Sequence, residues 1–394
     1  MANIFIPYVY HNNIDNKFYM VKTSKPLGSP NNHIITSSVY NTGVKLSKSS
    51  EFLNAYMFLI EMIMLYDTCY ISQDDLVYLY AVLGKDDTES LLKSTAISVY
   101  NTQSTKLGLH KFGDKYKVSV ESVEITQANF KQKITSMVTS YPSNNKFKEW
   151  YSKSILRTLN EAFYVNDLNN ILDNVSKTSL EELLNSNTMN VIEQSKDEET
   201  TMVDYQQIKL NRLLHFHYYL NLTRHIGCDH IFIPEELSGL FDYYDIQGIN
   251  RNSLENVFQN VKSLEQIPDI AQLVKNGDLA IADIIEIRNT KEAKKFREWI
   301  SAIGLKTDNL TADEIKSYYH ESCMKNTKFS RLYNSKKGNI IKTSISLITG
   351  NLPGVSTAIS LVDLFISLGL DNFNPAQFTR DQLLELIKRK TKRT

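Results

Sequence analysis

The spacing of apolar and polar positions changes along the chain, and it separates the predicted strands from the predicted helices. Residues 3–10 and 17–23 are rich in strand-forming side chains and flank a polar stretch, so they predict a hairpin. Apolar and polar positions alternate in 115–123, which predicts a second hairpin with 107–111. Residues 51–65 carry an apolar stripe at helical spacing. The N-terminal part is therefore expected to mix strands and helices.

One helix is marked at both ends by residues that favour helix termini. Ser72, with Asp75 three residues later, is typical of an N-cap followed by an acid in the first turn. Gly84 is a residue type that commonly ends a helix, and a short helix and a strand over 96–100 are expected after it. From about residue 126 the pattern is helical. Further helices are predicted near 127–139, 144–164, 166–174, 179–194, 204–226, 252–263, 268–275, 278–288, 290–303 and 312–333.

The composition also favours a protein made mostly of helices. Only 14 glycines and 8 prolines occur in 394 residues, well below the roughly 7% and 5% of average proteins, which disfavours many-turned sandwiches and propellers. We therefore predict an α+β fold that is predominantly α-helical. It is expected to have a small mixed α/β N-terminal part, a helical middle and a C-terminal helical hairpin, in domains 1–125, 126–321 and 322–394.

Charge is unevenly distributed, although the 44 basic and 44 acidic side chains cancel over the whole chain. From Ser322 to the C-terminus there are twelve Lys or Arg residues and four acids, a local charge of +8 (12 − 4). An asymmetry of this kind predicts either a polyanionic partner, such as anionic lipid or nucleic acid, or attraction between oppositely charged parts of the chain.

The C-terminal region also contains twenty consecutive uncharged residues, between Lys342 and Asp363. The turn signal at 351–354 divides them, so we predict a hairpin of helices 339–349 and 355–370, followed by an amphipathic helix and a basic tail. This arrangement predicts docking on another protein or on an anionic membrane; a hairpin packed against the rest of the protein is the alternative. The residues expected to dock are Lys336, Lys337, Lys342, Leu352, Leu364, Phe365, Lys388, Arg389 and Lys390.

Two histidine patterns are candidates for chemistry. His225, Cys228 and His230 offer three ligands of the kind zinc prefers, but no fourth ligand is apparent, so we predict packing and no metal. Arg212 and His217 form the Arg-x4-His signature of HEPN-type ribonucleases, which cut RNA without a metal. An imidazole moves the 2′-hydroxyl proton and a guanidinium stabilises the phosphorane charge in such enzymes. That interpretation requires a dimer, and a buried helix is the alternative.

Other motifs carry little chemistry. Glu292 and Lys294 match the E-x-K of restriction-type nucleases, but the neighbouring apolar residues have helical spacing, so we predict a solvated helix face. Residues 288–297 are basic enough to contact nucleic acid. The sequence has no GxxxxGK[ST], GxGxxG, HExxH, GxSxG or CxxC motif, which disfavours P-loop hydrolysis, Rossmann redox chemistry and zinc proteolysis. No cofactor is expected.

The expected location is the cytoplasm, with membrane association on activation. Cys69, Cys228 and Cys323 lie far apart in the sequence, as is typical of reduced intracellular proteins. The N-terminus has no basic segment and no long apolar segment, so no signal peptide is expected. The sequence does not predict an oligomeric state.

Four stretches of the sequence form one further pattern: 65–71 before the helix that ends at Gly84, 224–234, 285–299, and 352–365 with Pro375 and Phe378. Together they are similar to bacterial and mobile-element proteins of unassigned function from genomic islands that carry anti-phage systems. This resemblance implies a prokaryotic accessory protein with a role in defence, and it implies no catalytic residue. The absent catalytic motifs and the uneven charge predict a sensor or effector that acts through protein–protein or inducible membrane interaction; the Arg212/His217 ribonuclease is the alternative.

Overall fold

The computed structural model groups the described residues into two compact units, each presented by itself below. The sheet unit comprises Asn3–Leu59 and Thr68–Arg251, and the helical unit comprises Met1–Ala2, Ile60–Asp67 and Asn252–Thr394. The described residues are 2–7, 17–27, 29–42, 49–102, 106–112, 115–121, 151–160, 163–165, 170–171, 173–175, 205–233, 239–241, 243–244, 246, 248–251, 253–304, 311–324, 370 and 373–391.

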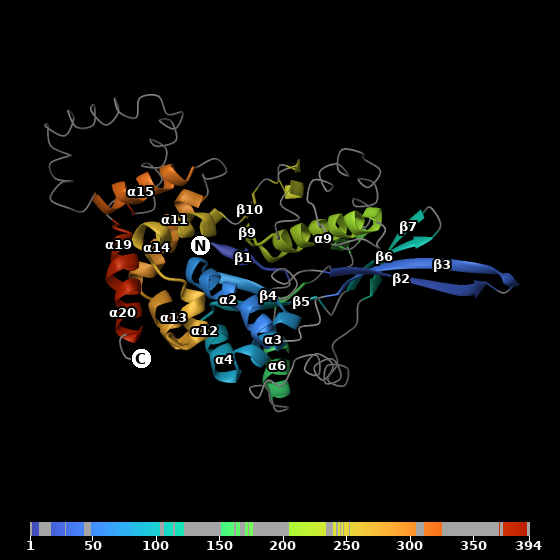
Figure 1. The fold of residues 1–394 in the computed structure, drawn as a ribbon, viewed down its shortest axis with the longest axis horizontal. Helices are drawn as coiled ribbons and strands as arrows, with labels where there is room; N and C mark the ends of the chain where they lie inside the picture. Colours follow the sequence, from blue (N-terminus) through green and yellow to red (C-terminus); the bar gives the residue numbers. More distant parts are fainter. Residues whose placement is uncertain are drawn as a thin grey trace, which may run out of the picture. The chain divides into compact units, whose positions relative to one another are not determined.

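A parallel six-stranded sheet forms the centre of the sheet unit (Figure 1). Its strand order is β10-β9-β1-β4-β5-β8. The chain therefore adds β4, β5 and β8 on one side of β1 first, and it adds β9 and β10 on the other side of β1 later. The strands are β1 (Asn3–Phe5), β4 (Thr68–Ser72), β5 (Ile97–Asn101), β8 (Phe163–Tyr164), β9 (His230–Ile231) and β10 (Asn250–Arg251).

The predicted hairpin of 3–10 with 17–23 is wrong, because β1 pairs in parallel with β4 and β9 instead. Ile4 and Phe5 point to opposite faces of the sheet, and neither side chain is exposed. Burial on both faces is typical of parallel strands and disfavours a hairpin with one solvated face.

A second sheet in the same unit is antiparallel, with strand order β2-β3-β6-β7. The predicted hairpin of 107–111 with 115–123 is confirmed, since β6 pairs with β7 from Lys106 opposite Glu121 to Phe112 opposite Lys115. Its strands are β2 (Lys17–Leu27), β3 (Ser29–Thr42), β6 (Lys106–Phe112) and β7 (Lys115–Glu121).

Helices cover both faces of the parallel sheet, with α9 on one side and α3, α4 and α6 on the other (Figure 1). Aromatic rings pack together on the α9 side. The Phe5 ring lies 4.9 Å from that of Tyr100 and 6.5 Å from that of Tyr219. The helices are α3 (Gln73–Val82), α4 (Lys85–Lys93), α6 (Tyr151–Asn160) and α9 (Tyr205–Ile226).

The predicted ends of α3 are confirmed. The Ser72 side chain accepts a hydrogen bond from the Asp75 backbone N–H at 3.1 Å, which satisfies one of the donors left free at a helix N-terminus. Gly84 follows the helix with a φ of 86°, in the left-handed region that favours glycine. This residue also precedes α4 directly.

The helical unit packs its helices around Trp299, which is 1% exposed and donates from Nε1 to Ser322 Oγ at 3.0 Å. The C-terminal helical stretch joins this core, because the Phe378 ring lies 4.7 Å from that of Phe296. The elements are α11 (Ser253–Glu265), α12 (Ile270–Asn276), α13 (Ile281–Arg288), α14 (Lys291–Gly304), α15 (Ala312–Met324), α19 (Ala376–Phe378), a π-helical segment (Thr379–Leu384) and α20 (Glu385–Thr391).

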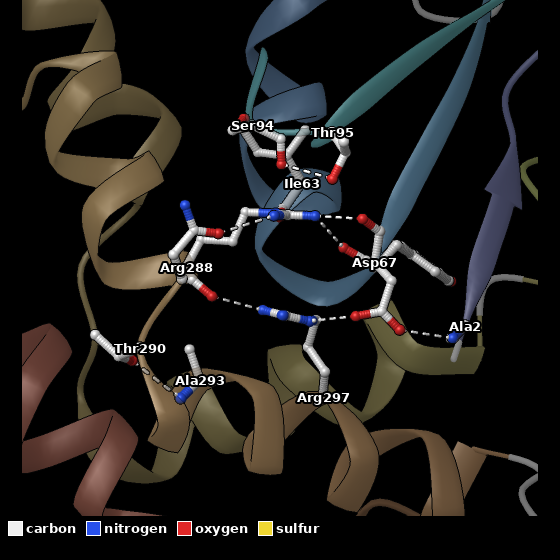
Figure 2. A network of polar contacts seen from close by, with 11 residues as sticks. Ala2, Ile63, Asp67, Ser94, Thr95, Arg288, Thr290, Ala293 and Arg297 are labelled. Carbon is white, nitrogen blue, oxygen red and sulfur yellow. Dashed lines mark hydrogen bonds and ion pairs between the residues drawn. The ribbon is translucent and has the colours of Figure 1, made fainter. Parts of the chain in front are cut away.

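Two arginines form hydrogen bonds at the C-terminal end of α2 (Ser49–Leu65) and just after it, as Figure 2 shows. Arg288 Nε donates to the Ile63 carbonyl at 2.6 Å, and Nη2 donates to the carbonyls of Tyr66 and Asp67. Arg297 Nε donates to Asp67 Oδ1 at 3.0 Å. The last carbonyls of a helix lack partners within the helix, so the Arg288 guanidinium supplies missing donors, whereas Arg297 binds the side chain of Asp67.

The α+β, predominantly α-helical class is thus confirmed. The predicted helices 51–65, 204–226, 252–263, 278–288 and 290–303 each correspond to a helix of the structure. Those at 127–139 and 179–194 lie outside the described residues. The division into 1–125, 126–321 and 322–394 stays a prediction.

Candidate functional site

The carboxyl ends of the parallel strands are the first place to search for a site. In open α/β sheets, ligands bind outside these ends, near the point where the strand order changes direction. Here the direction changes between β1 and β9, and β4 is the other neighbour of β1. The segment that follows β4 therefore lies next to the strand at this point, and the segment that follows β5 lies one strand farther along the same edge.

Buried polar side chains collect at that edge of the sheet. Ser72 ends β4 and Asp75 lies in the first turn of α3, and these residues are 3% and 1% exposed. Asn101 ends β5 and Thr102 follows it, and both are also buried. Burying polar groups without full hydrogen bonding costs free energy, so such a group of side chains calls for an explanation.

Helix α9 adds two tyrosines to this group from the opposite face of the sheet. Burial raises the pKa of Tyr218, and the neighbouring Thr102 side chain partly offsets the rise. Burial also raises the pKa of Tyr219, and the adjacent Tyr218 and the negative charge of Asp75 raise it further. We call Ser72, Asp75, Thr102, Tyr218 and Tyr219 the carboxyl-edge cluster.

The hydrogen bonding within the carboxyl-edge cluster is incomplete. Ser72 Oγ donates to Asp75 Oδ2 at 2.7 Å, so the serine and the carboxylate are partners. Tyr218 Oη is buried and makes no hydrogen bond of normal geometry to any described residue. A tyrosine hydroxyl that is buried usually finds a partner. Thr102 is the one side chain close enough to act on this hydroxyl, so Tyr218 keeps at least one unused donor or acceptor among the described residues.

The electrostatics of the carboxyl-edge cluster disfavour a phosphate at α3. The positive end of the α3 dipole already faces the Asp75 carboxylate, and Ser72 occupies the Asp75 backbone N–H. A phosphate there would meet the negative charge of Asp75. The arrangement instead suits the hydroxyl and amide groups of an uncharged molecule, which a carboxylate and hydroxyls bind well.

The sequence indicated part of this cluster, but in a different role. Ser72 and Asp75 were predicted as a helix cap, and they form one. Nothing in the sequence pattern marked Thr102 or Tyr218, because the apolar residues around Tyr218 are typical of a buried helix. The signal that was available is polar residues directly after two apolar strands, at 71–75 and 99–102.

The two residues of the proposed ribonuclease signature, Arg212 and His217, both lie on α9. The Arg212 side chain is outside the described residues. The His217 ring is half-buried and meets the rings of Phe216 and Tyr244 edge-on, at 5.5 and 5.3 Å between centroids. The ribonuclease remains a prediction, with His217 placed in an aromatic environment.

The three residues considered as zinc ligands differ in their environments. Cys228 and His230 are buried, whereas His225 is exposed. Burial lowers the pKa of His230 to about 4, so its imidazole is neutral at pH 7. Burial raises the pKa of the Cys228 thiol and disfavours the thiolate that a metal binds. Among the residues that the structure describes, no group of three His, Cys, Asp or Glu side chains is arranged to hold a metal.

The basic residues of the predicted docking segment are partly accounted for by contacts within the helical unit. Lys390 Nζ lies 2.7 Å from Asp283 Oδ1, and Lys388 Nζ lies 2.9 Å from Glu385 Oε1. Within the described ranges, no helix combines the length and the apolar character needed to cross a membrane. The remaining docking residues, Lys336, Lys337, Lys342, Leu352, Leu364 and Phe365, lie outside the described residues.

The predicted basic face of 288–297 is also partly used inside the helical unit. Arg288 and Arg297 are 3% and 4% exposed and bind the end of α2 and Asp67. Lys291 and Lys294 are exposed. Glu292 accepts a hydrogen bond from Gln382 Nε2 at 2.8 Å, and it lies on a helix, as predicted for the E-x-K residues.

Comparison with known proteins found no matching family model, no matching curated protein and no matching solved structure. The functional argument therefore rests on the geometry of the two units. The carboxyl-edge cluster is the feature that this geometry favours most as a site.

Proposed function

We propose that the protein is an accessory sensor whose sheet unit binds a small, uncharged polar ligand at the carboxyl-edge cluster. The observation that carries this proposal is the buried Tyr218 hydroxyl, which makes no hydrogen bond of normal geometry to a described residue and lies beside Thr102, in the cluster that also contains the Ser72–Asp75 pair. A ligand hydroxyl or amide would supply the missing partner. The sensor role is the one expected from the absent catalytic motifs and the uneven charge, and the accessory role is the one that the resemblance implies.

The ligand class follows from the charges. The carboxyl-edge cluster contains the carboxylate of Asp75, and its other four members are Ser, Thr and Tyr side chains. Neutral hydroxyl-rich molecules, such as nucleosides, hexoses and polyols, pair with a carboxylate without the repulsion that a phosphate would meet. We therefore propose a neutral ligand and not its phosphorylated form.

The test measures the melting temperature of the full chain with matched probes. Adenosine, uridine, glucose and inositol are compared with their monophosphates. A ligand at a hundred times its Kd stabilises the folded state by about 2.7 kcal/mol, enough to raise the melting temperature by several degrees. We expect a rise with a neutral probe and none with its phosphate. No rise with any neutral probe contradicts the proposal.

The decisive variant is Tyr218→Phe, which removes the hydroxyl and keeps the ring. If the hydroxyl binds a ligand, the variant is as stable as the wild type or more stable, yet it loses the ligand-induced rise. If the cluster is only structural, the variant loses stability and responds to the probes like the wild type. Tyr243→Phe is the matched control, because Tyr243 is 40% exposed.

We propose docking through the C-terminal segment as a second function, with a partner protein or an anionic membrane as the surface. Lys388 and Arg389 are exposed on α20, where both also contact Glu385, a residue that is itself exposed. Each basic residue near an anionic membrane contributes about 1 kcal/mol. Flotation with phosphatidylserine vesicles, comparing the wild type with Lys388→Glu/Arg389→Glu, tests this. Equal recovery at low and high salt contradicts membrane docking.

A further inference from the structure

In the helical unit, a hydrogen bond to a carboxyl group connects the end of α2 with the beginning of α11. Glu255 lies in the first turn of α11, and Tyr66 follows the last residue of α2. Tyr66 Oη donates a hydrogen bond to Glu255 Oε2 at 3.1 Å. The other oxygen, Oε1, is buried and has no hydrogen-bond partner among the described residues. The Glu255 carboxyl therefore has one hydrogen-bonded and one unsatisfied oxygen.

The charges near Glu255 do not neutralise it. Lys262 is the neighbouring cation on α11, but its ammonium pairs with Glu61 of α2. Glu61 Oε2 also accepts a hydrogen bond from Gln259 Nε2 at 2.9 Å. Glu255 thus faces a second carboxylate that already holds the local cation.

Three arginines on other elements of the helical unit are also paired elsewhere. Arg288 of α13 binds the backbone carbonyls at the end of α2, and Arg297 of α14 binds Asp67. Glu265, at the opposite end of α11, is paired with Arg380. Lys262 and these three arginines therefore each have a partner other than Glu255.

These surroundings oppose the loss of a proton from Glu255. Burial raises the pKa of Glu255 from its ordinary value of 4.5 to about 7, and the charge of Glu61 raises it as well. The hydrogen bonds from its own backbone N–H and from Tyr66 act in the opposite direction. A protonated carboxyl can also use its O–H as a donor, which an ionised carboxyl cannot.

We propose that Glu255 is a proton-binding site through which pH near neutrality controls the stability of the α2–α11 contact in the helical unit. The protonated carboxyl keeps the hydrogen bond with Tyr66 without placing a second buried charge beside Glu61. Loss of the proton leaves two neighbouring carboxylates, of which only Glu61 is paired with the Lys262 ammonium. This role is separate from ligand binding in the sheet unit.

The sign of the effect follows from proton linkage. Between pH 4.5 and 7 the folded protein holds a proton on Glu255 that the unfolded chain has released. Stability must then fall as pH rises through this range, and it must level off above pH 7. The unfolding equilibrium constant gains about tenfold per pH unit from this one group.

The experiment measures unfolding of the helical unit in the full chain between pH 5 and 8. Hydrogen exchange followed by mass spectrometry in increasing urea reports peptides from α11 and α14 directly. Three proteins are compared: wild type, Glu255→Gln, and Glu298→Gln as a control. Glu298 is an exposed glutamate on α14.

We expect the unfolding constant of the wild type to rise about tenfold per pH unit relative to Glu255→Gln between pH 5 and 7. Glu298→Gln should follow the wild type. Parallel profiles for the wild type and Glu255→Gln overturn the proposal. If Glu255→Gln does not fold, Tyr66→Phe gives an independent test. Removing this donor must move the midpoint of the pH-dependent change in the unfolding constant to higher pH. An unchanged midpoint also overturns the proposal.

Discussion

Nε of Arg297 lies 3.0 Å from Oδ1 of Asp67, a residue 230 positions away in the sequence. Arg297 is 4% exposed, and its Nη1 also donates to the Arg288 carbonyl at 3.0 Å. The other oxygen of Asp67 accepts a hydrogen bond from the Ala2 backbone N–H at 3.0 Å. The pair therefore links three separate stretches of the helical unit (Figure 2).

Removing the guanidinium group should destabilise the helical unit strongly. We expect Arg297→Met to lower the free energy of unfolding by about 3 kcal/mol, because the Asp67 carboxylate and the Arg288 carbonyl both lose a buried donor. Lys294→Met is the control on the same helix, and we expect it to change stability by less than about 0.5 kcal/mol, since Lys294 is exposed. Urea denaturation followed by hydrogen exchange of α14 measures both. Equal stability of the two variants contradicts a structural role for the pair.

Loss of the Ser72 cap should weaken the sheet unit. We expect Ser72→Ala to cost about 1 kcal/mol, because the Asp75 backbone N–H loses its acceptor and the Asp75 side chain loses a donor. Ser90→Ala is the matched control, since the Ser90 hydroxyl donates only to the carbonyl of Asp86 at a solvent-exposed position. Protection of the α3 backbone amides against hydrogen exchange measures the difference in stability between the two variants. A loss as large in Ser90→Ala would show that the cap is not responsible.

The ion pair of Lys390 with Asp283 should make stability depend on pH in the acid range. Burial raises the pKa of Asp283, but the hydrogen bond from Lys390, the hydrogen bond from the Ala280 backbone N–H and the charge of Lys390 together lower it more, so the net pKa lies below 3.8. The stabilisation is therefore complete above about pH 4 and is lost as pH falls through the lowered pKa.

Lys390→Met removes the part of this stabilisation that comes from Lys390 and leaves the hydrogen bond from the Ala280 backbone N–H. We expect a loss of no more than about 1 kcal/mol at pH 7, because Lys390 is partly exposed, and a smaller difference from the wild type at pH 3. Lys388→Met is the control, since the Lys388–Glu385 pair is exposed on both sides. Acid titration of the unfolding free energy measures the effect; a difference that stays constant with pH argues against the ion pair.

The ribonuclease alternative gives a prediction of its own. We expect purified wild type and Arg212→Ala/His217→Ala to leave a labelled RNA equally intact, because the His217 ring packs edge-on against Phe216 and Tyr244. Incubation without added metal is the relevant condition, since the signature is metal-independent. Cleavage by the wild type that the double variant lacks establishes the ribonuclease instead.

The sequence by itself determined the local structure. Helix spacing identified 51–65, 204–226 and 290–303, and the Ser72 cap and Gly84 marked the ends of α3, because these features depend on residues within one or two turns. The 107–111 hairpin was also identified, since its two strands are joined directly.

Only the tertiary structure decided which distant strands pair and which polar groups meet. The sequence pattern predicted that residues 3–10 pair with the nearby residues 17–23, whereas β1 pairs with β9, which begins at His230. Two-residue strands carry too little pattern to predict such a partner. The carboxyl-edge cluster and the Glu255–Tyr66 contact also depend on long-range packing, because each brings together side chains from separate elements. The burial that shifts the pKa of Tyr219 and of Glu255 arises only when those elements come together.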